Sequence, residues 1–117
     1  MPQRGIQGAK GVYGLISKMT AVSEQRDALI AIMLDGAANM PGCLSYIVAR
    51  DSSDPTTIWI TEVWDSQASH EASLSLPPVQ QAILRARPLL STHFGYSIVT
   101  EPLGGFGLAS KRMSTSH

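Results

Sequence analysis

Apolar and polar residues alternate along two neighbouring stretches in the middle of the chain, and a period of two residues predicts β-strands. The first stretch is Cys43–Arg50 and the second is Thr57–Trp64. The segment Asp51–Pro55 between them is rich in turn-forming residues, which favours a hairpin. Both faces of the second strand carry large side chains: Ile58, Ile60, Glu62 and Trp64 share one face, and Trp59, Thr61 and Val63 share the other.

Two large faces need two covering layers. Helices of the same chain can cover one face of the sheet, but no segment is left over to cover the other. This shortage predicts a homodimer in which two copies pack sheet against sheet.

Apolar residues at spacings of three, four and seven predict a helix from Ser23 to about Asn39, ended by Pro41-Gly42. Ser23 is the expected N-cap, because its hydroxyl can accept a hydrogen bond from a free backbone N–H. The expected inner face consists of Val22, Leu29, Ile30, Met33, Ala37 and Met40.

The second half of the chain predicts a helix that is split in two. A short helix from Gln67 to about Ser75 follows the N-cap Ser66, and Pro77-Pro78 breaks it. The next helix carries Val79, Ile83 and Ala86 or Arg87 on its inner face and ends or kinks at Pro88. With a first strand at 12–19 and a last strand at 96–101, the order along the chain is β-α-β-β-α-β. This is the ferredoxin-like α+β pattern with an antiparallel sheet.

The length of 117 residues predicts one domain. Residues 12–102 are expected to form it, after a flexible arm at 1–11 and before a Gly-rich, then Ser/Thr/Lys/Arg-rich tail at 103–117 that is flexible or packs on a partner.

Charge and composition exclude several classes of protein. Nine basic and nine acidic side chains cancel, which leaves no basic stripe for nucleic acid. The sequence contains no run of about 20 apolar residues, so no membrane span is expected. The first residues do not resemble a signal peptide, and a cytoplasmic location is therefore expected. The single cysteine, Cys43, predicts a buried, inert thiol, and the scattered histidines show no metal-ligand spacing.

The strongest candidate site is the corner where the second strand meets the short helix. Trp64 either stacks on a flat ligand or fills the core, and His70 is either a general base or a partly exposed helix residue. Glu62 shares the face of Trp64 and needs a partner such as Arg50, Arg85 or Arg87. It is either a structural ion pair or hydrogen-bond anchor, or a catalytic base.

Other aromatic and imidazole side chains have weaker claims. Tyr46 either donates a hydrogen bond to a ligand or fills the core. Trp59 points the other way and is expected in a subunit interface. His93 is expected in a loop, and His117 belongs to the tail.

Three motifs together resemble the antibiotic biosynthesis monooxygenase family. Pro41-Gly-Cys-Leu-Ser-Tyr46 is similar to the family's start of its second strand, and Glu62-Val-Trp64-Asp-Ser66 to the end of its third. The segment from Ala68 to Pro77 is similar to the helix that follows. The resemblance implies a dimeric α+β barrel with a pocket between sheet and helices in each subunit. Some members oxidise polycyclic phenols or anthrones with O2 and no metal or flavin.

The resemblance is incomplete at two positions of the expected pocket. Trp64 matches the pocket tryptophan, but Ile60 stands where the aromatic monooxygenases have an asparagine. Ser73 stands where many members have a histidine, and His70, one helical turn earlier, could replace it. The strand at 12–19 contains no asparagine, which argues against haem degradation.

Three functions remain open. The first is a cofactor-independent monooxygenase for an electron-rich aromatic of the anthrone, quinol or polyphenol type, with His70 as base and Trp64 positioning the ring. Glu62, Tyr46, Ile60 and Ser73 would line its substrate pocket. The second is a dimeric module that binds a small apolar aromatic molecule without chemistry. The third is an accessory protein whose terminal arms exchange across a dimer.

Overall fold

The computed structural model describes residues 11–91 and 95–107. The expected arm before Gly11, the loop with His93, and the tail from Leu108 to His117 lie outside the described residues. The elements follow in the order β1 (Tyr13–Thr20), α2 (Arg26–Gly36), β2 (Cys43–Arg50), β3 (Thr57–Trp64), α3 (Gln67–Ser73), α4 (Pro77–Ala86), the 3-10 helix η1 (Arg87–Leu89) and β4 (Tyr96–Thr100).

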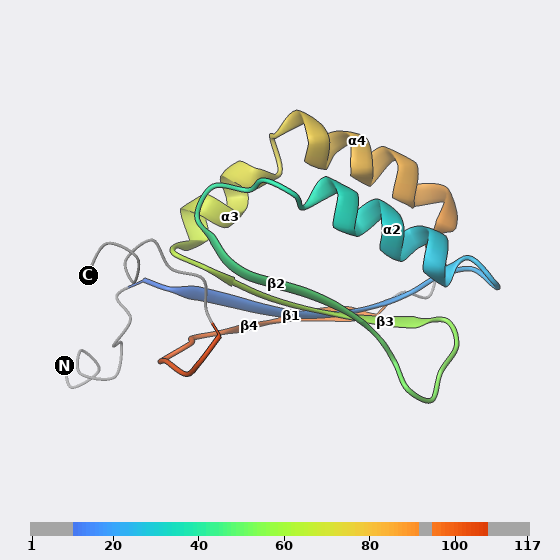
Figure 1. Cartoon of the computed structure of the whole chain (residues 1–117), viewed down its shortest axis with the longest axis horizontal. Helices are drawn as coiled ribbons and strands as arrows, with labels where there is room; N and C mark the ends of the chain where they lie inside the picture. The colour runs from blue at the N-terminus through green and yellow to red at the C-terminus, as the bar shows by residue number, and fades with distance from the viewer. Residues whose placement is uncertain (1–10, 92–94, 108–117) are drawn as a thin grey trace.

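The four strands form one antiparallel sheet in the order β2-β3-β1-β4. The helices lie together on one side of it, and no helix of the described chain covers the other side (Figure 1). This is the predicted ferredoxin-like α+β fold, with its second helix divided into α3 and α4. The bounds of β2 and β3 are confirmed, and those of β1 and β4 differ by one residue at each changed end.

The strand register sorts the side chains onto two faces. On the helix side, Tyr46 lies opposite Glu62, and Glu62 lies opposite Leu15 of β1. The core beneath the helices is built around Leu29, Ile58 and Ile60, which are buried, with Trp64 buried near the end of β3. The inward face predicted for β3 is therefore confirmed.

The other face of the sheet carries a row of apolar side chains. Ile47 pairs with Thr61, Thr61 with Ile16, and Ile16 with Ile98. Ile47 is 57% exposed and Ile98 is 50% exposed. Among the described residues, the row is thus a largely apolar and partly exposed surface.

The predicted start of the first helix at Ser23 is wrong. Helix α2 begins at Arg26, and Gln25 stands at its N-cap without a side-chain hydrogen bond. The N–H of Val22 donates to the carbonyl oxygen of Leu89 at 2.8 Å, and Glu24 has a φ of 63°. These features hold the connection from β1 outside helical geometry until Gln25. The predicted end near Asn39 is also too late, because α2 stops at Gly36.

The signals for the split helix were accurate. The Ser66 hydroxyl accepts a hydrogen bond from the N–H of Ser69 at 3.0 Å, which caps α3 as predicted. Helix α4 begins with Pro77 in its first turn, where the missing N–H costs nothing, and gives way to η1 before Pro88.

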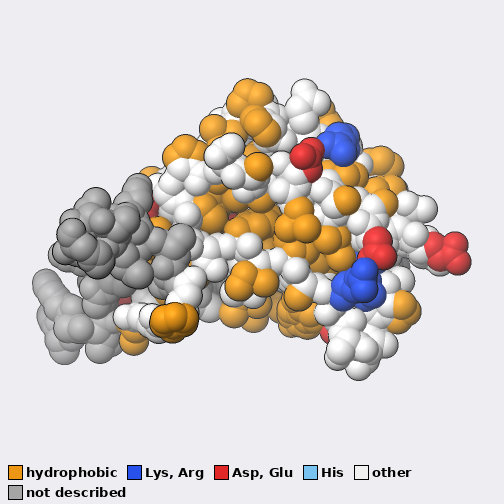
Figure 2. Space-filling view, in the orientation of Figure 1, with side chains coloured by type: hydrophobic (Ala, Val, Ile, Leu, Met, Phe, Trp, Pro, Cys, Tyr) orange, Lys and Arg blue, Asp and Glu red, His pale blue; other side chains and the backbone are white. Residues whose placement is uncertain are grey.

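In the side view of Figure 2, charged side chains are few, and hydrophobic side chains gather in the middle of the molecule, between the helices and the sheet. Exposed ion pairs join Arg50 to Asp27 at 3.1 Å and Arg85 to Asp35 at 3.4 Å. No described helix is long and apolar enough to cross a membrane.

Candidate functional site

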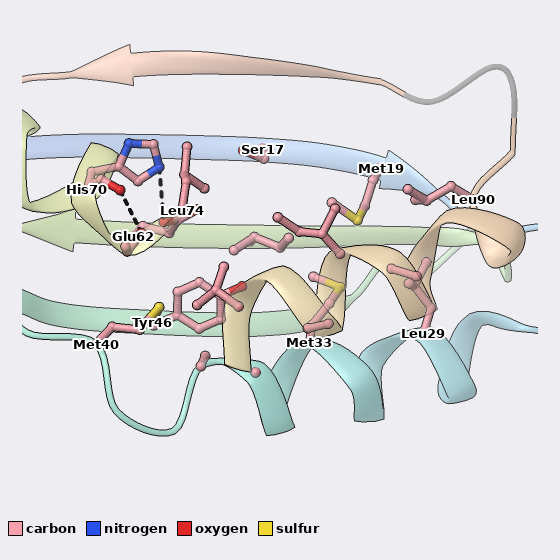
Figure 3. Close-up of a pocket in the computed structure, with 18 of the residues that line it drawn as sticks. Ser17, Met19, Leu29, Met33, Met40, Tyr46, Glu62, His70, Leu74 and Leu90 are labelled. Carbon is pink, nitrogen blue, oxygen red and sulfur yellow. Dashed lines mark hydrogen bonds and ion pairs between the residues drawn. The ribbon is translucent and has the colours of Figure 1, made fainter. Parts of the chain in front are cut away.

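A cavity of about 320 Å³ lies between the helix-bearing face of the sheet and helices α2, α3 and α4. Figure 3 shows its lining, with Glu62 and His70 toward one end and Leu29 and Leu90 toward the other. Most of the lining is apolar and includes the side chains of Met19, Leu29, Met33, Met40, Ile60, Leu74, Val79, Ile83 and Leu90. A cavity of this size and polarity suits a small, flat, apolar molecule.

Glu62 is the only carboxylate that lines the cavity among the described residues. Its Oε1 accepts a hydrogen bond from Nε1 of Trp64 at 2.9 Å. Burial raises the pKa of Glu62 above its usual range, while the Trp64 bond and the nearby His70 oppose that rise. The partners of Glu62 are Trp64 and His70 and not one of the expected arginines. Arg50 and Arg85 are paired with aspartates on α2, and no ion pair joins Arg87 to Glu62 among the described residues.

His70 lies on α3 directly above Glu62. Its Nε2 is 4.0 Å from Oε1 of Glu62, and its side chain is 18% exposed. Its Nδ1 is buried and has no hydrogen-bond partner within the described chain. The ring also lies between two others, with centroids 5.4 Å from Trp64 and 5.4 Å from Tyr13. His70 is therefore a fixed member of the site and not a loosely exposed helix residue.

Trp64 lines the cavity but is only 1% exposed. Its indole N–H is bound to Glu62, and its ring meets His70 edge-on at 69°. Because the Trp64 ring is so deeply buried, it offers little area on which a ligand could stack. The contribution visible in the geometry is the placement of Glu62 and His70.

Tyr46 also lines the cavity and lies opposite Glu62 on the neighbouring strand. Burial, with smaller contributions from the charges of Glu62 and Cys43, raises the pKa of Tyr46 above its usual range. The phenol therefore stays neutral and can donate a hydrogen bond to a ligand oxygen.

The two positions that depart from the family pattern also line the cavity. Ile60 is part of its apolar floor. The hydroxyl of Ser73 donates to the carbonyl oxygen of His70 at 2.6 Å, one turn back on α3. Ser73 therefore supports the helix turn that carries His70.

Two predicted side chains lie outside the cavity. Cys43 is half-buried, its thiol contacts the carbonyl oxygen of Ser45 at 3.5 Å, and burial raises the pKa of the thiol. Trp59 lies on the other face of the sheet, where its indole N–H donates to Asp51 at 2.8 Å. That bond, with two backbone N–H bonds, lowers the pKa of Asp51 to about 2.

Some residues of the site were not predicted. Tyr13 and Ser17 of β1 point toward the helices: Tyr13 contacts His70, and Ser17 lines the cavity and hydrogen-bonds Ser97 at 2.8 Å. Strict alternation along β1 would have placed both on this face. Across residues 11–91 and 95–107, no group of three or more His, Cys, Asp or Glu side chains is arranged to hold a metal ion.

Comparison with known families gives a match over most of the domain. Residues 12–85 match the family model described as antibiotic biosynthesis monooxygenase. A provisionally assigned antibiotic biosynthesis monooxygenase from Chloroflexus aurantiacus is 58% identical, with a TM-score of 0.81, and the match covers 85% of this chain and 100% of that chain. No curated protein matched.

More distant structures share the fold alone. A provisionally assigned antibiotic biosynthesis monooxygenase from Caulobacter crescentus is 17% identical with a TM-score of 0.73, covering 80% of this chain and 92% of that one. A variant of SnoaB, a cofactor-independent oxygenase from Streptomyces nogalater, is 12% identical with a TM-score of 0.67. The match covers 81% of this chain and 96% of that chain.

Proposed function

Because this chain belongs to the antibiotic biosynthesis monooxygenase family, we propose that it is a cofactor-independent monooxygenase acting on an electron-rich aromatic with O2. The substrate would be a phenolic compound of the anthrone, quinol or polyphenol class. The observation that carries this proposal is the Glu62–His70 pair, set at one end of a mostly apolar cavity. SnoaB, which shares the fold, is described as a cofactor-independent oxygenase.

The pair offers a place for a phenolic hydroxyl. The 4.0 Å between Nε2 of His70 and Oε1 of Glu62 is too long for a direct hydrogen bond. A hydroxyl oxygen beside them could lie about 2.8 Å from both atoms. His70 then accepts the phenolic proton at Nε2, since Nδ1 is buried, and the Glu62 carboxylate stabilises the imidazolium.

Electrons for the reaction come from the substrate. The deprotonated substrate transfers one electron to O2, and the resulting radical and superoxide combine to form a carbon–oxygen bond. The peroxide then loses water, so that one oxygen atom stays in a new carbonyl and the other leaves as water. An apolar cavity favours this sequence because it excludes water from the anion and its radical.

A binding module without chemistry is the second candidate. Ile60 and Ser73 favour it, because neither supplies the amide or imidazole that the resemblance leads us to expect there. Turnover separates the two functions, whereas ligand binding is common to both.

We also propose a homodimer in which the apolar row Ile16, Ile47, Thr61 and Ile98 packs against a second copy. Two of its isoleucines are at least half exposed in the single chain, so burying them would be favourable. A cytoplasmic location fits a chain with one unpaired cysteine, since thiols stay reduced there.

Oxygen uptake by chelator-treated protein tests the enzymatic proposal. With 1,8-dihydroxyanthrone and simple hydroquinones, we expect wild-type uptake above the spontaneous rate. The His70→Ala variant should lose about 100-fold or more in turnover and keep its ligand affinity within a few-fold, because a general base acts on the rate.

Glu71→Ala is the matched control, because Glu71 is the next residue on α3 and is exposed. It should retain full uptake. Full activity in His70→Ala would remove His70 from the mechanism. No wild-type uptake with any compound would favour the binding module.

A further inference from the structure

The basic side chains of the described residues have partners with one exception. Lys18 lies over the Trp59 ring at 5.8 Å, and Arg26 donates to three backbone carbonyl oxygens. Arg50 and Arg85 are paired with aspartates. Arg87 has neither an ion pair nor a side-chain hydrogen bond within the described chain, and it lines the cavity.

Arg87 stands at the end of the cavity away from Glu62. It is the first residue of η1, and its carbonyl oxygen accepts a hydrogen bond from the N–H of Leu90. Leu90 bridges to Ala21, just beyond the end of β1 that pairs with Ile58. Ile58 and Glu62 are four residues apart on β3, which corresponds to about 13 Å. In Figure 3, Leu90 and Glu62 mark these two ends.

The cavity is therefore polar at both ends and apolar between them. Met33 and Ile60 line the part between them. Glu62 and His70 supply an acid–base pair at the enclosed end, while Arg87 supplies an exposed guanidinium at the other. An exposed guanidinium pays little desolvation cost while the cavity is empty, and it can form a bidentate pair with a carboxylate when a ligand enters.

We propose that Arg87 binds a carboxylate on the ligand, so that this cavity selects flat hydroxyaromatic acids over neutral hydroxyaromatics. The hydroxyl would lie at the Glu62–His70 end and the carboxylate at the Arg87 end. The placement of the hydroxyl rests on the proposed function, but the binding of the carboxylate does not require turnover.

Two matched ligands test the proposal by calorimetric titration of the full chain. 6-Hydroxy-2-naphthoate carries the carboxylate, and 6-hydroxy-2-naphthamide has the same shape without the charge. We expect wild-type protein to bind the acid about three- to tenfold more tightly than the amide at low salt. This preference should shrink as salt is added, because the pair is exposed.

Arg87→Gln should bind both ligands alike, with the affinity of wild type for the amide. Arg85→Gln is the control, because Arg85 lies two residues earlier, pairs with Asp35 and does not line the cavity. It should keep the wild-type preference.

Three results would overturn the proposal: no preference in wild type, a preference that survives in Arg87→Gln, or no binding of either ligand. Its failure is distinguishable from failure of the oxygenase proposal. If the preference for the acid is lost in Arg87→Gln and no substrate gives oxygen uptake, carboxylate binding by Arg87 is supported and the oxygenase proposal is contradicted. If neutral anthrones give oxygen uptake but the acid is not preferred, the oxygenase proposal is supported and carboxylate binding by Arg87 is contradicted.

Discussion

At the scale of single residues, Glu62 gives the cavity its acid–base character. A buried carboxyl group is costly to ionise unless hydrogen bonds or opposite charges stabilise it. Glu62 receives one hydrogen bond, from Trp64, and has His70 at 4.0 Å. The net result is a raised pKa of the Glu62 carboxyl group.

The raised pKa predicts how stability depends on pH. The unfolded chain releases the Glu62 proton at the ordinary glutamate value of about 4.3, but the folded chain holds it to higher pH. Between these values the folded state binds more protons, so the Glu62 contribution to stability falls as pH rises.

Glu62→Gln keeps an acceptor for the Trp64 N–H and removes this titration. We therefore expect the stability of the variant relative to wild type to increase as pH rises above about 4. Urea unfolding at several pH values measures the difference. A difference that stays constant with pH would contradict the raised pKa.

The sequence could predict which residues meet at the site, but not how they pair. Alternation along β3 placed Glu62 and Trp64 on one face, and the Ser66 cap started the helix that carries His70. The expected arginine partner was wrong, because the nearest donor is Trp64, two residues along the same strand. Such a choice depends on side-chain rotamers and on the packing of α3 over β3, which periodicity does not determine.

At the scale of elements, the contact between α2 and α4 shapes the cavity roof. Gly36 ends α2 where it meets α4, and a Cβ atom there would lie 2.6 Å from the Cβ of Ala82. The two helices approach this closely because Gly36 has no side chain.

Gly36→Ala sets two effects against each other. Alanine favours the helix by up to about 1 kcal/mol, but overpacking at a fixed contact costs about 1–3 kcal/mol. We expect a net loss of about 1–2 kcal/mol in the free energy of unfolding, measured by chemical denaturation. Adding Ala82→Gly should restore part of it by vacating the space. A single variant as stable as wild type would show that the helices separate without cost.

The elements themselves were largely predictable, and the start of α2 shows what local signals miss. β2 and β3 have their predicted bounds because alternation and turn residues act locally. The predicted start of α2 was wrong because the N–H of Val22 donates to the carbonyl oxygen of Leu89, which is 67 positions later in the chain. A cap residue such as Ser23 is recognised from its neighbours in the sequence, and these do not indicate a hydrogen bond to a residue as distant as Leu89.

At the scale of the whole molecule, the described helices cover one face of the sheet and none of them covers the other. The uncovered face predicts dimerisation through the row that contains Ile47. Ile47→Lys should leave the isolated chain folded, because Ile47 is already exposed. It should raise the dimer dissociation constant about tenfold or more, because it would bury an unpaired ammonium.

Size-exclusion chromatography with light scattering measures the mass of wild type and variant. Leu84→Lys is the control, because Leu84 is equally exposed but lies on α4, on the helix side of the sheet. A monomeric wild type at micromolar concentration, or an unchanged dimer in Ile47→Lys, would contradict the proposed interface.

The most direct test of the oxygenase proposal follows the oxygen atoms. Chelator-treated protein would turn over 1,8-dihydroxyanthrone under oxygen-18 gas, with mass spectrometry of the product. Monooxygenation predicts one heavy oxygen atom per product molecule, formed faster than without protein, and a loss of that rate enhancement in His70→Ala. Product without heavy oxygen, or heavy product formed no faster than in buffer, would contradict catalysis by this cavity.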